Sequence, residues 1–363
     1  MNGFEINVGP AHPSTHGVLK FKLTIEGDTI KKAEAEIGFL HRGKEKAAED
    51  VTYMSYLPFV DKIEYVSALN MELLYSSLIE KALNIQISER AKYIRTIMAE
   101  FGRIMNHLIF LAAFGEDLGL ISEFFWALRE RELLMDIIEE ISGGRLAPVY
   151  IRPGGVFFDF KEGIENKIIE AMEKLEYKIK EVHEYAIIKN SIFKARTKGV
   201  GILKKEDAIN LGVTGPNARA SGINRDYRKL NPYLIYDKLD FKVPVFDEGD
   251  AYARCLVRME EIKESIKIIK EATKNIPKGD YLIKMPWIIK IPPAYTIEIQ
   301  ETPRGEIGMI LVSDGSERAY RLKIRSASFF AIKAMEKILE GEKIANFYPI
   351  LASLDPVMGE IDR

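Results

Sequence analysis

Cysteine is almost missing from this 363-residue sequence, which contains only Cys255. A single thiol excludes a disulfide within the chain, zinc ribbons, and iron–sulfur clusters that this chain would hold by itself. Any redox cofactor must therefore belong to a partner. The sequence also lacks an uninterrupted apolar run of about 18 residues, and its first five residues have no signal-peptide character. We expect a chain that neither spans a membrane nor crosses one by the usual route.

An excess of charge of either sign is missing as well. The 52 Lys and Arg residues nearly balance the 54 Asp and Glu residues, and no block of like charge indicates nucleic acid or a polybasic membrane anchor. Hydrophobic residues make up 47% of the chain, enough for one large or two medium domains with a real core. Abundant Lys, Glu and Ile beside one Cys is typical of thermophilic proteins. We expect a globular, cytoplasmic protein.

Strand patterns lie near both ends of the chain, and helical patterns lie between them. Residues 5–36 alternate and turn at Gly27-Asp28, which predicts a β-hairpin. Four amphipathic helices in a row, which predict a bundle, are expected over residues 44–56, 61–83, 91–113 and 122–141. Beyond them the pattern predicts helices over 161–188 and 250–274, a loop-rich stretch over 193–246, a proline-rich connector over 277–293, strands over 296–302, 306–313 and 319–325, and a helix over 328–340.

This order predicts an α+β fold with a central helical bundle and small antiparallel β subdomains near the N- and C-termini. We place the N-terminal β subdomain at residues 1–44. The bundle core with its loop-rich insert occupies 45–292, and the C-terminal β subdomain with the tail occupies 293–363.

The helix expected from residue 91 onward carries polar residues beside its apolar face. Glu100, Arg103 and His107 form a seam at positions i, i+3 and i+7, which must find partners if it is buried. Gly115 and Gly119 flank Asp117 and predict that the helix breaks before it. A carboxylate on such a turn is a candidate site. The alternative is that Asp117 caps the next helix at Ser122 or closes the turn.

Two histidines lie in a proline-bracketed turn before the first predicted strand. His12 and His16 are four residues apart outside a helix, so they share no face on which to chelate a metal as a pair. A loop histidine suits hydrogen bonding or proton transfer, because its ordinary pKa of about 6.5 is close to working pH. The alternative is a pair of ordinary surface histidines.

The positions of three more side chains make them candidate site residues. Arg42 and Glu45 lie where the first predicted helix begins, where Glu45 either caps the helix or bridges to an arginine. Tyr65 is either a core aromatic or a tyrosine whose hydroxyl faces a substrate.

Six motifs, spread from end to end, resemble the 49 kDa (D) subunit family of complex I, which is related to the large subunit of nickel–iron hydrogenases. They are Gly9-Pro-x-His-Pro-Ser-Thr-His-Gly17, Gly38-x-Leu-His-Arg-Gly-x-Glu-Lys46, Asp117-Leu-Gly119 with Phe124-Phe125 and Arg129-Glu-Arg-Glu132, Arg219-Ala-Ser-Gly222, Ser313-Asp-Gly315 and Asp355-x-Val-Met-Gly-Glu-Ile-Asp-Arg363.

The resemblance implies a hydrogenase-like fold and a cavity beside a partner subunit, where an acceptor receives electrons from the partner's [4Fe–4S] cluster. His16 and Tyr65 match the two headgroup-contacting residues, and Asp117 matches the acid that pairs with that histidine. Further residues are expected to bind the acceptor or to surround the site; these are His12, Arg42, Glu45, Arg103 and His107.

The hydrogenase relatives hold nickel and iron with two Cys-x-x-Cys pairs. Glu64 and Ser67 stand at the first pair of positions, and Val357 and Glu360 stand at the second. Two carboxylates, a hydroxyl and a valine cannot replace four thiolates for that metal pair. We therefore expect no bound metal and no cofactor held by this chain alone.

The function expected from the resemblance is an electron-transfer catalytic subunit of a complex I-like membrane oxidoreductase that translocates ions. Its donor would be NADH, F420H2 or ferredoxin, and its acceptor quinone-like. The expected partners are a small iron–sulfur (B-type) subunit, a C-type subunit, a ferredoxin-like cluster subunit and membrane-arm subunits including the H-type, at the cytoplasmic side of the membrane.

Two alternatives stay open at this point. Because the connector between Pro286 and Thr296 is shorter than in many members of the family, an archaeal complex that reduces sulfane sulfur, polysulfide or a phenazine is one of them. The other is a catalytically inert scaffold.

Overall fold

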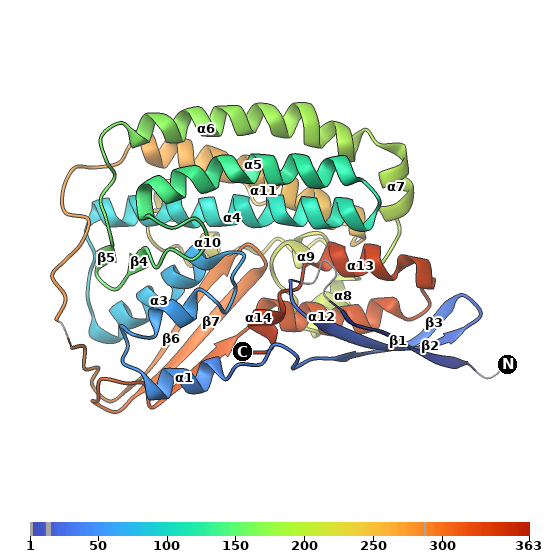
Figure 1. Cartoon of the computed structure of the whole chain (residues 1–363), viewed down its shortest axis with the longest axis horizontal. Helices are drawn as coiled ribbons and strands as arrows, with labels where there is room; N and C mark the ends of the chain where they lie inside the picture. The colour runs from blue at the N-terminus through green and yellow to red at the C-terminus, as the bar shows by residue number, and fades with distance from the viewer. Residues whose placement is uncertain (1–2, 12–15, 287) are drawn as a thin grey trace.

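Long helices lie over two small antiparallel sheets in the computed structural model, which describes residues 3–11, 16–286 and 288–363 (Figure 1). The predicted α+β class is confirmed. The helical layer consists of α4 (Glu89–Asp117), α5 (Ile121–Ser142), α6 (Ile164–Lys178) and α11 (Ala251–Lys274). Their apolar faces share one core cluster, which includes Ile97, Leu134, Ile168 and Ile262. Burial of these faces holds the bundle together.

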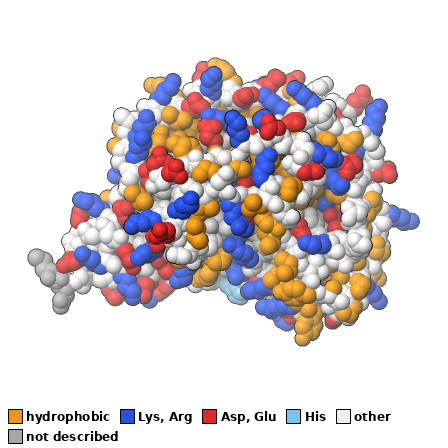
Figure 2. All heavy atoms as spheres, turned by 180° about the vertical axis from the view of Figure 1, so that it is seen from behind, with side chains coloured by type: hydrophobic (Ala, Val, Ile, Leu, Met, Phe, Trp, Pro, Cys, Tyr) orange, Lys and Arg blue, Asp and Glu red, His pale blue; other side chains and the backbone are white. Residues whose placement is uncertain are grey.

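The bundle is built from other helices than the four consecutive ones predicted. Only α4 and α5 come from that run, and the later helices α6 and α11 complete it. The helix predicted over 161–188 is present, but its second half, Ile179–Ile188, is a π-helix (η1). Acidic and basic side chains are interspersed over the top of the molecule, where α6 lies (Figure 2). These charges form the solvated face of the bundle.

The N-terminal sheet contains β1 (Phe4–Ala11), β2 (Leu19–Glu26) and β3 (Thr29–Glu36) in that order. The predicted hairpin is β2–β3, and β1 adds a third antiparallel strand. Its buried face packs against α12 (Ala327–Leu339) and α13 (Phe347–Leu354). The first and last parts of the chain therefore share a core.

The C-terminal sheet contains β6 (Ala294–Thr302), β7 (Gly305–Ser313) and β8 (Arg321–Arg325), close to the three predicted strands. It shares a core with α1 (Lys44–Asp50), α2 (Leu57–Val60) and α3 (Ala68–Leu83). The predicted domain limits at residues 44 and 292 stay a prediction. The remaining elements are β4 (Ile151–Arg152), β5 (Gly155–Val156), α7 (Ser191–Thr197), α8 (Lys205–Asn210), α9 (Gly215–Arg219), α10 (Tyr227–Leu230), η2 (Tyr236–Lys238), η3 (Ile344–Asn346) and α14 (Met358–Ile361).

Two predicted helices have the wrong limits. The helix expected over 44–56 ends at Asp50, because the next residues pair with a loop of the C-terminal sheet. Thr52 bridges to Arg318, and the Tyr53 N–H donates to the Glu317 carbonyl at 3.2 Å. The helix expected over 61–83 begins only at Ala68, after a series of turns over residues 61–67. Helical periodicity is a local signal, and tertiary pairing overrides it here.

The predicted helix break at Gly115 is also wrong, because α4 continues to Asp117 and the turn lies at Gly119. Gly115 instead permits close packing, since an added Cβ would lie 3.0 Å from Cβ of Glu123 on α5. By length and composition α4 passes the test for a membrane-spanning helix, yet 89% of its most apolar window is buried inside the chain. A buried core helix passes that test equally well.

Candidate functional site

Tyr65 and His16 come together from two distant loops. The turns over residues 61–67 carry Tyr65, whose hydroxyl donates a hydrogen bond to the His16 carbonyl just before β2. The His16 imidazole pairs with the buried carboxylate of Asp355, with 3.4 Å between Nε2 and Oδ1. Burial raises the pKa of Tyr65 to about 12, so its hydroxyl keeps its proton at neutral pH.

A cavity of about 510 Å³ opens beside Tyr65, and it is lined by Gly17, Val18, Leu40, Arg42, Lys44, Lys62 and Tyr65. Apolar and cationic side chains share this lining, and no carboxylate is among the described residues that form it. Such a lining suits an organic ligand that has both apolar parts and atoms with negative or partly negative charge.

Two other residues predicted at this site are Asp117 and His12. Asp117 is the last residue of α4 and is half-buried, while α5 begins after Leu120 without a side-chain cap. Its pairing with His16 stays a prediction. His12 lies outside the described residues.

Of the four positions that the resemblance matches to metal-binding thiolates of hydrogenases, Glu64 contacts a buried arginine, Arg304, from the β6–β7 turn. Arg304 donates to Glu64, to Asn106, and to both the carbonyl (2.8 Å) and the carboxylate (3.0 Å) of Asp355. The Glu360 carboxylate accepts the Ser328 N–H at 2.5 Å. These contacts tie the tail to the turns that carry Tyr65.

The remaining two of these positions, Ser67 and Val357, do not provide ligands for a metal. Ser67 donates its hydroxyl to the Asn70 side chain at 2.6 Å, and Val357 is a buried apolar residue. With a guanidinium already bound to Glu64, the residues present do not fit a nickel–iron centre. Among the residues that the structure describes, no three His, Cys, Asp or Glu side chains are grouped as metal ligands.

Neighbouring charges divide the buried carboxyl groups around Arg304 into two kinds. Burial raises the pKa of Glu64 to about 8, an effect that Arg304 opposes, and it also raises the pKa of Glu360. Asp355 is equally buried, but Arg304 and His16 hold its pKa below the usual range. Glu64 is therefore largely protonated at neutral pH, whereas Asp355 is ionised.

The polar seam of α4 is buried with partners, as predicted. Arg103 contacts Glu100 at 3.3 Å and donates to the Glu301 carbonyl at 2.8 Å. His107 lies 2.8 Å from Glu261, and burial lowers the pKa of the imidazole to about 4. The neutral His107 and the buried Arg103 link α4 to α11 and β6.

Glu45 and Arg42 lie on either side of the start of α1. Glu45 accepts from Arg363 Nε at 3.1 Å, from Lys323 and from the Ile324 N–H. Of the two roles left open by the sequence, it therefore bridges to an arginine, and no described side chain caps α1. Arg42 is exposed and lines the cavity.

Arg304 and Lys44 are the residues of this region that sequence reasoning missed. Arg304 follows Pro303 between two predicted strands, and only the turn signal marked the position. Lys44 occupies the variable position of the motif that ends at Lys46, so the resemblance assigned nothing to it.

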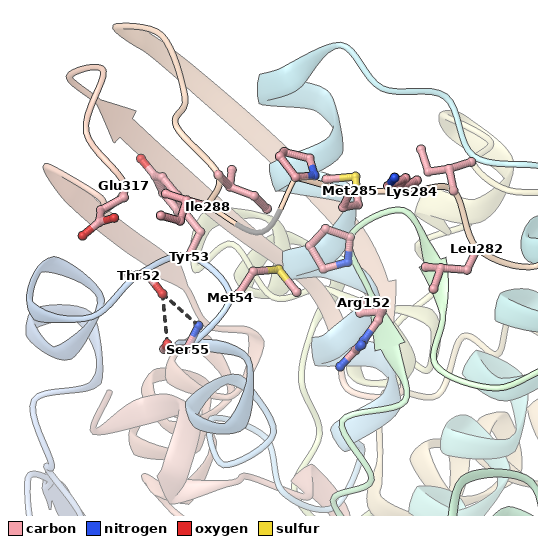
Figure 3. A pocket seen from close by; sticks show the side chains of 14 residues that line it. Thr52, Tyr53, Met54, Ser55, Arg152, Leu282, Lys284, Met285, Ile288 and Glu317 are labelled. Carbon is pink, nitrogen blue, oxygen red and sulfur yellow. Dashed lines mark hydrogen bonds between the residues drawn. The ribbon is translucent and has the colours of Figure 1, made fainter.

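A second, larger cavity is lined by residues of the connector, and Tyr65 is not among its lining residues (Figure 3). Its volume is about 770 Å³, and apolar side chains such as Met54, Met285 and Ile288 line much of it. Arg152 lies at one end of the cavity and Glu317 at the other (Figure 3). Hydrophobic side chains also gather at the lower right of Figure 2, the side on which the tips of β6 and β7 lie.

Comparison with known sequences assigns the chain to one family of proteins. The chain matches the model of the respiratory-chain NADH dehydrogenase 49 kDa subunit over residues 117–290 and 283–363. It belongs to this family, as its motifs predict.

Relatives of almost the same length are named as the D subunit of NADH-quinone oxidoreductase. Those of Bacillus cereus and Bacillus anthracis are 42% identical to this chain over 358 residues, which is 98% of this chain and 98% of each relative. That of Geobacillus kaustophilus is 42% identical over 98% of this chain and 97% of its own. The chain is therefore similar to oxidoreductase subunits of complex I.

Proposed function

We propose that this chain is the subunit of a complex I-like NADH-quinone oxidoreductase that binds the quinone in the cavity beside Tyr65. Electrons reach the quinone one at a time from a [4Fe–4S] cluster on a small iron–sulfur partner subunit. The observation that carries the proposal is that Tyr65 lines this cavity beside Gly17, while its hydroxyl donates to the backbone carbonyl of His16, the residue before Gly17.

The chemistry of the site suits the reduction of a quinone. Such a reduction consumes two electrons and two protons, and a phenol and an imidazole are groups that donate protons to carbonyl oxygens. In this proposal Tyr65 and His16 donate the protons, and Asp355 and Asp117 hold the charge of the imidazole. The pair formed by His16 and its carboxylates titrates as a unit, and the protons return from solvent.

The proposed setting is that of a complex I-like assembly. We place the chain at the cytoplasmic side of a membrane, in contact with a B-type iron–sulfur subunit, a C-type subunit, a ferredoxin-like cluster subunit and the H-type subunit of the membrane arm. Charge changes at the quinone would bias a conformational equilibrium that the membrane arm uses to translocate ions.

The relatives give no support to the archaeal and sulfur-reducing alternatives. The named relatives are bacterial, and their names specify quinone. They also match this chain over nearly their full length, so a short connector is no argument for another acceptor.

The experiment compares purified complexes that carry His16→Ala, Tyr65→Phe or the exposed control Tyr185→Phe. We expect both site variants to lower the rate of short-chain quinone reduction at least about tenfold. A positioned proton donor usually contributes more than this to the rate. Tyr185→Phe should leave the rate unchanged. Full activity of both site variants in intact complexes would favour the scaffold.

A further inference from the structure

The cavity beside Tyr65 contains a buried lysine at its wall. Lys44 is the first residue of α1, and its side chain is 6% exposed while it lines the cavity. Its ammonium group donates hydrogen bonds to the Gly359 carbonyl at 3.0 Å and to the Lys62 carbonyl. Two acceptors use two of the three N–H donors of an ammonium group. Within the described residues the third donor remains for a ligand.

The charged groups around Lys44 do not neutralise it. Arg42, before α1, and Lys62, in the turns after α2, add positive charge from two sides. On α14 and just after it, Glu360 and Asp362 are the neighbouring carboxylates, and both bind elsewhere. Glu360 accepts the Ser328 N–H, and Asp362 accepts the N–H groups of Gly38 and Leu40 at 2.8 Å. Among the described residues Lys44 has no ion pair within 4.0 Å.

A buried ammonium group without a carboxylate partner is costly for a folded protein. The neighbouring backbone contacts do not remove this cost, because carbonyl groups supply only partial negative charge. Tyr56 adds to the rigidity of the site, since its hydroxyl donates to the Lys44 carbonyl at 2.9 Å. The position is therefore built to present a positive charge to whatever fills the cavity.

We infer that Lys44 is a substrate-binding residue, whose ammonium group faces the oxygen atoms of the acceptor and stabilises the negative charge that they gain as electrons arrive. The substrate class that this charge favours is an acceptor that becomes an oxyanion on reduction, as a quinone does. The inference rests on the proposed function, because it requires the acceptor to bind beside Tyr65. Lys44 contributes charge alone: no bond to it forms or breaks, and the two electrons and two protons are those already assigned.

The test uses the complete complex with Lys44→Met, and Lys46→Met as the matched control on the same helix, since Lys46 is exposed and pairs with Glu49. Short-chain quinone is the probe, reduced with the electron donor of the complex. Because the negative charge appears only on reduction, we expect kcat to fall about tenfold or more while KM changes much less. Lys46→Met should change neither. An unchanged kcat in an assembled Lys44→Met complex, or an effect on KM alone, overturns the inference.

A pH profile gives a second readout that a merely structural lysine would not move. Burial, with help from Arg42, lowers the pKa of Lys44 to about 8, so its charge is present below that pH and is lost above it. We expect the kcat of the wild-type complex to decline above pH 8, and the decline to move to higher pH in Lys44→Arg, because a guanidinium stays charged. This variant also serves if Lys44→Met fails to assemble, and an unmoved decline contradicts the inference.

Tyr65→Phe separates failure of the inference from failure of the proposed function. If Tyr65→Phe loses activity and Lys44→Met does not, the inference is wrong and the quinone site stands. If Tyr65→Phe and His16→Ala both keep full activity, the proposed function is wrong, and the inference falls with it.

Discussion

At the level of single residues, neighbouring charges determine whether a buried carboxyl group of this protein is protonated or ionised. Asp355 faces Arg304 and His16 and stays ionised, whereas Glu64 shares Arg304 with other acids and holds a proton. Both are fully buried, so the difference comes from the neighbouring charges. A buried acid with a raised pKa makes the folded state bind a proton that the unfolded state releases.

Glu64→Gln tests this state through stability. Glu64 has an ordinary pKa of 4.5 when unfolded and about 8 when folded, so its contribution to stability is present below pH 4.5 and is lost as pH rises toward 8. Glutamine does not titrate. Relative to wild type, the free energy of unfolding of Glu64→Gln should therefore rise between about pH 5 and pH 8, by up to about 1.4 kcal/mol per pH unit. The Tm of the variant relative to wild type should rise over the same range.

The exposed Glu162→Gln is the control for this measurement, and it should show the same difference from wild type at both ends of this pH range. Thermal unfolding of the purified chain provides the Tm. A Glu64→Gln difference that is equal at both ends would mean that Glu64 is ionised in the folded protein.

At the level of helices and turns, the short helix α14 and the turns over residues 61–67 touch without room between them. A Cβ added to Gly359 would lie 2.7 Å from the Ile63 carbonyl oxygen and 2.9 Å from the Tyr65 ring. Tyr65 is half-buried, but the Ile63 backbone cannot move aside cheaply. The glycine therefore allows the tail to pack directly behind Tyr65.

Gly359→Ala should push these two elements apart. We expect a loss of about 1–3 kcal/mol of stability, the usual cost of overpacking a core, together with slower quinone reduction because Tyr65 moves. Gly308→Ala is the control, since its Cβ would meet nothing closer than 3.4 Å. Thermal unfolding and the quinone assay check both effects. Equal behaviour of the two variants would show that the contact behind Tyr65 is loose.

At the level of the entire chain, the tail over residues 355–363 holds together parts that are far apart in sequence. Asp362 accepts the N–H groups of Gly38 and Leu40, and Arg363 donates to Glu45. Nearly all of residues 355–363 are buried. The tail therefore acts as a core element, although a chain end is more often poorly ordered.

Deletion of residues 355–363 should prevent the chain from reaching its compact state. The deletion removes the carboxylate that faces Arg304 and leaves the buried guanidinium with one carboxylate partner fewer, which is strongly destabilising. Limited proteolysis of the expressed chain measures the result, with rapid degradation expected. Arg363→Ala, which loses mainly one partner of Glu45, should remain resistant. Equal resistance of the deletion and wild type would refute this role of the tail.

Local patterns predicted most of the elements and part of the site. The helix around Ile97, the strands near residues 21–36 and 296–325 and the buried polar seam follow from periodicity, although α4 and β7 are buried on more than one face. Periodicity missed the end of α1 and the late start of α3, where backbone pairing with residues 317–318 competes with helix formation. Motifs identified Tyr65 and His16, but their mutual contact needed the fold.

Residues that are neighbours in the sequence were enough to define the class of fold and the family. Only the tertiary structure shows that Arg304 forms ion pairs with Glu64 and Asp355. It also shows that Lys44 lines the cavity, and that no carboxylate is among the described lining residues. The difference arises from separation along the chain. Partners that lie 51 and 240 residues from Arg304 leave no periodic signal, and burial changes their charge states only once the chain has brought them together.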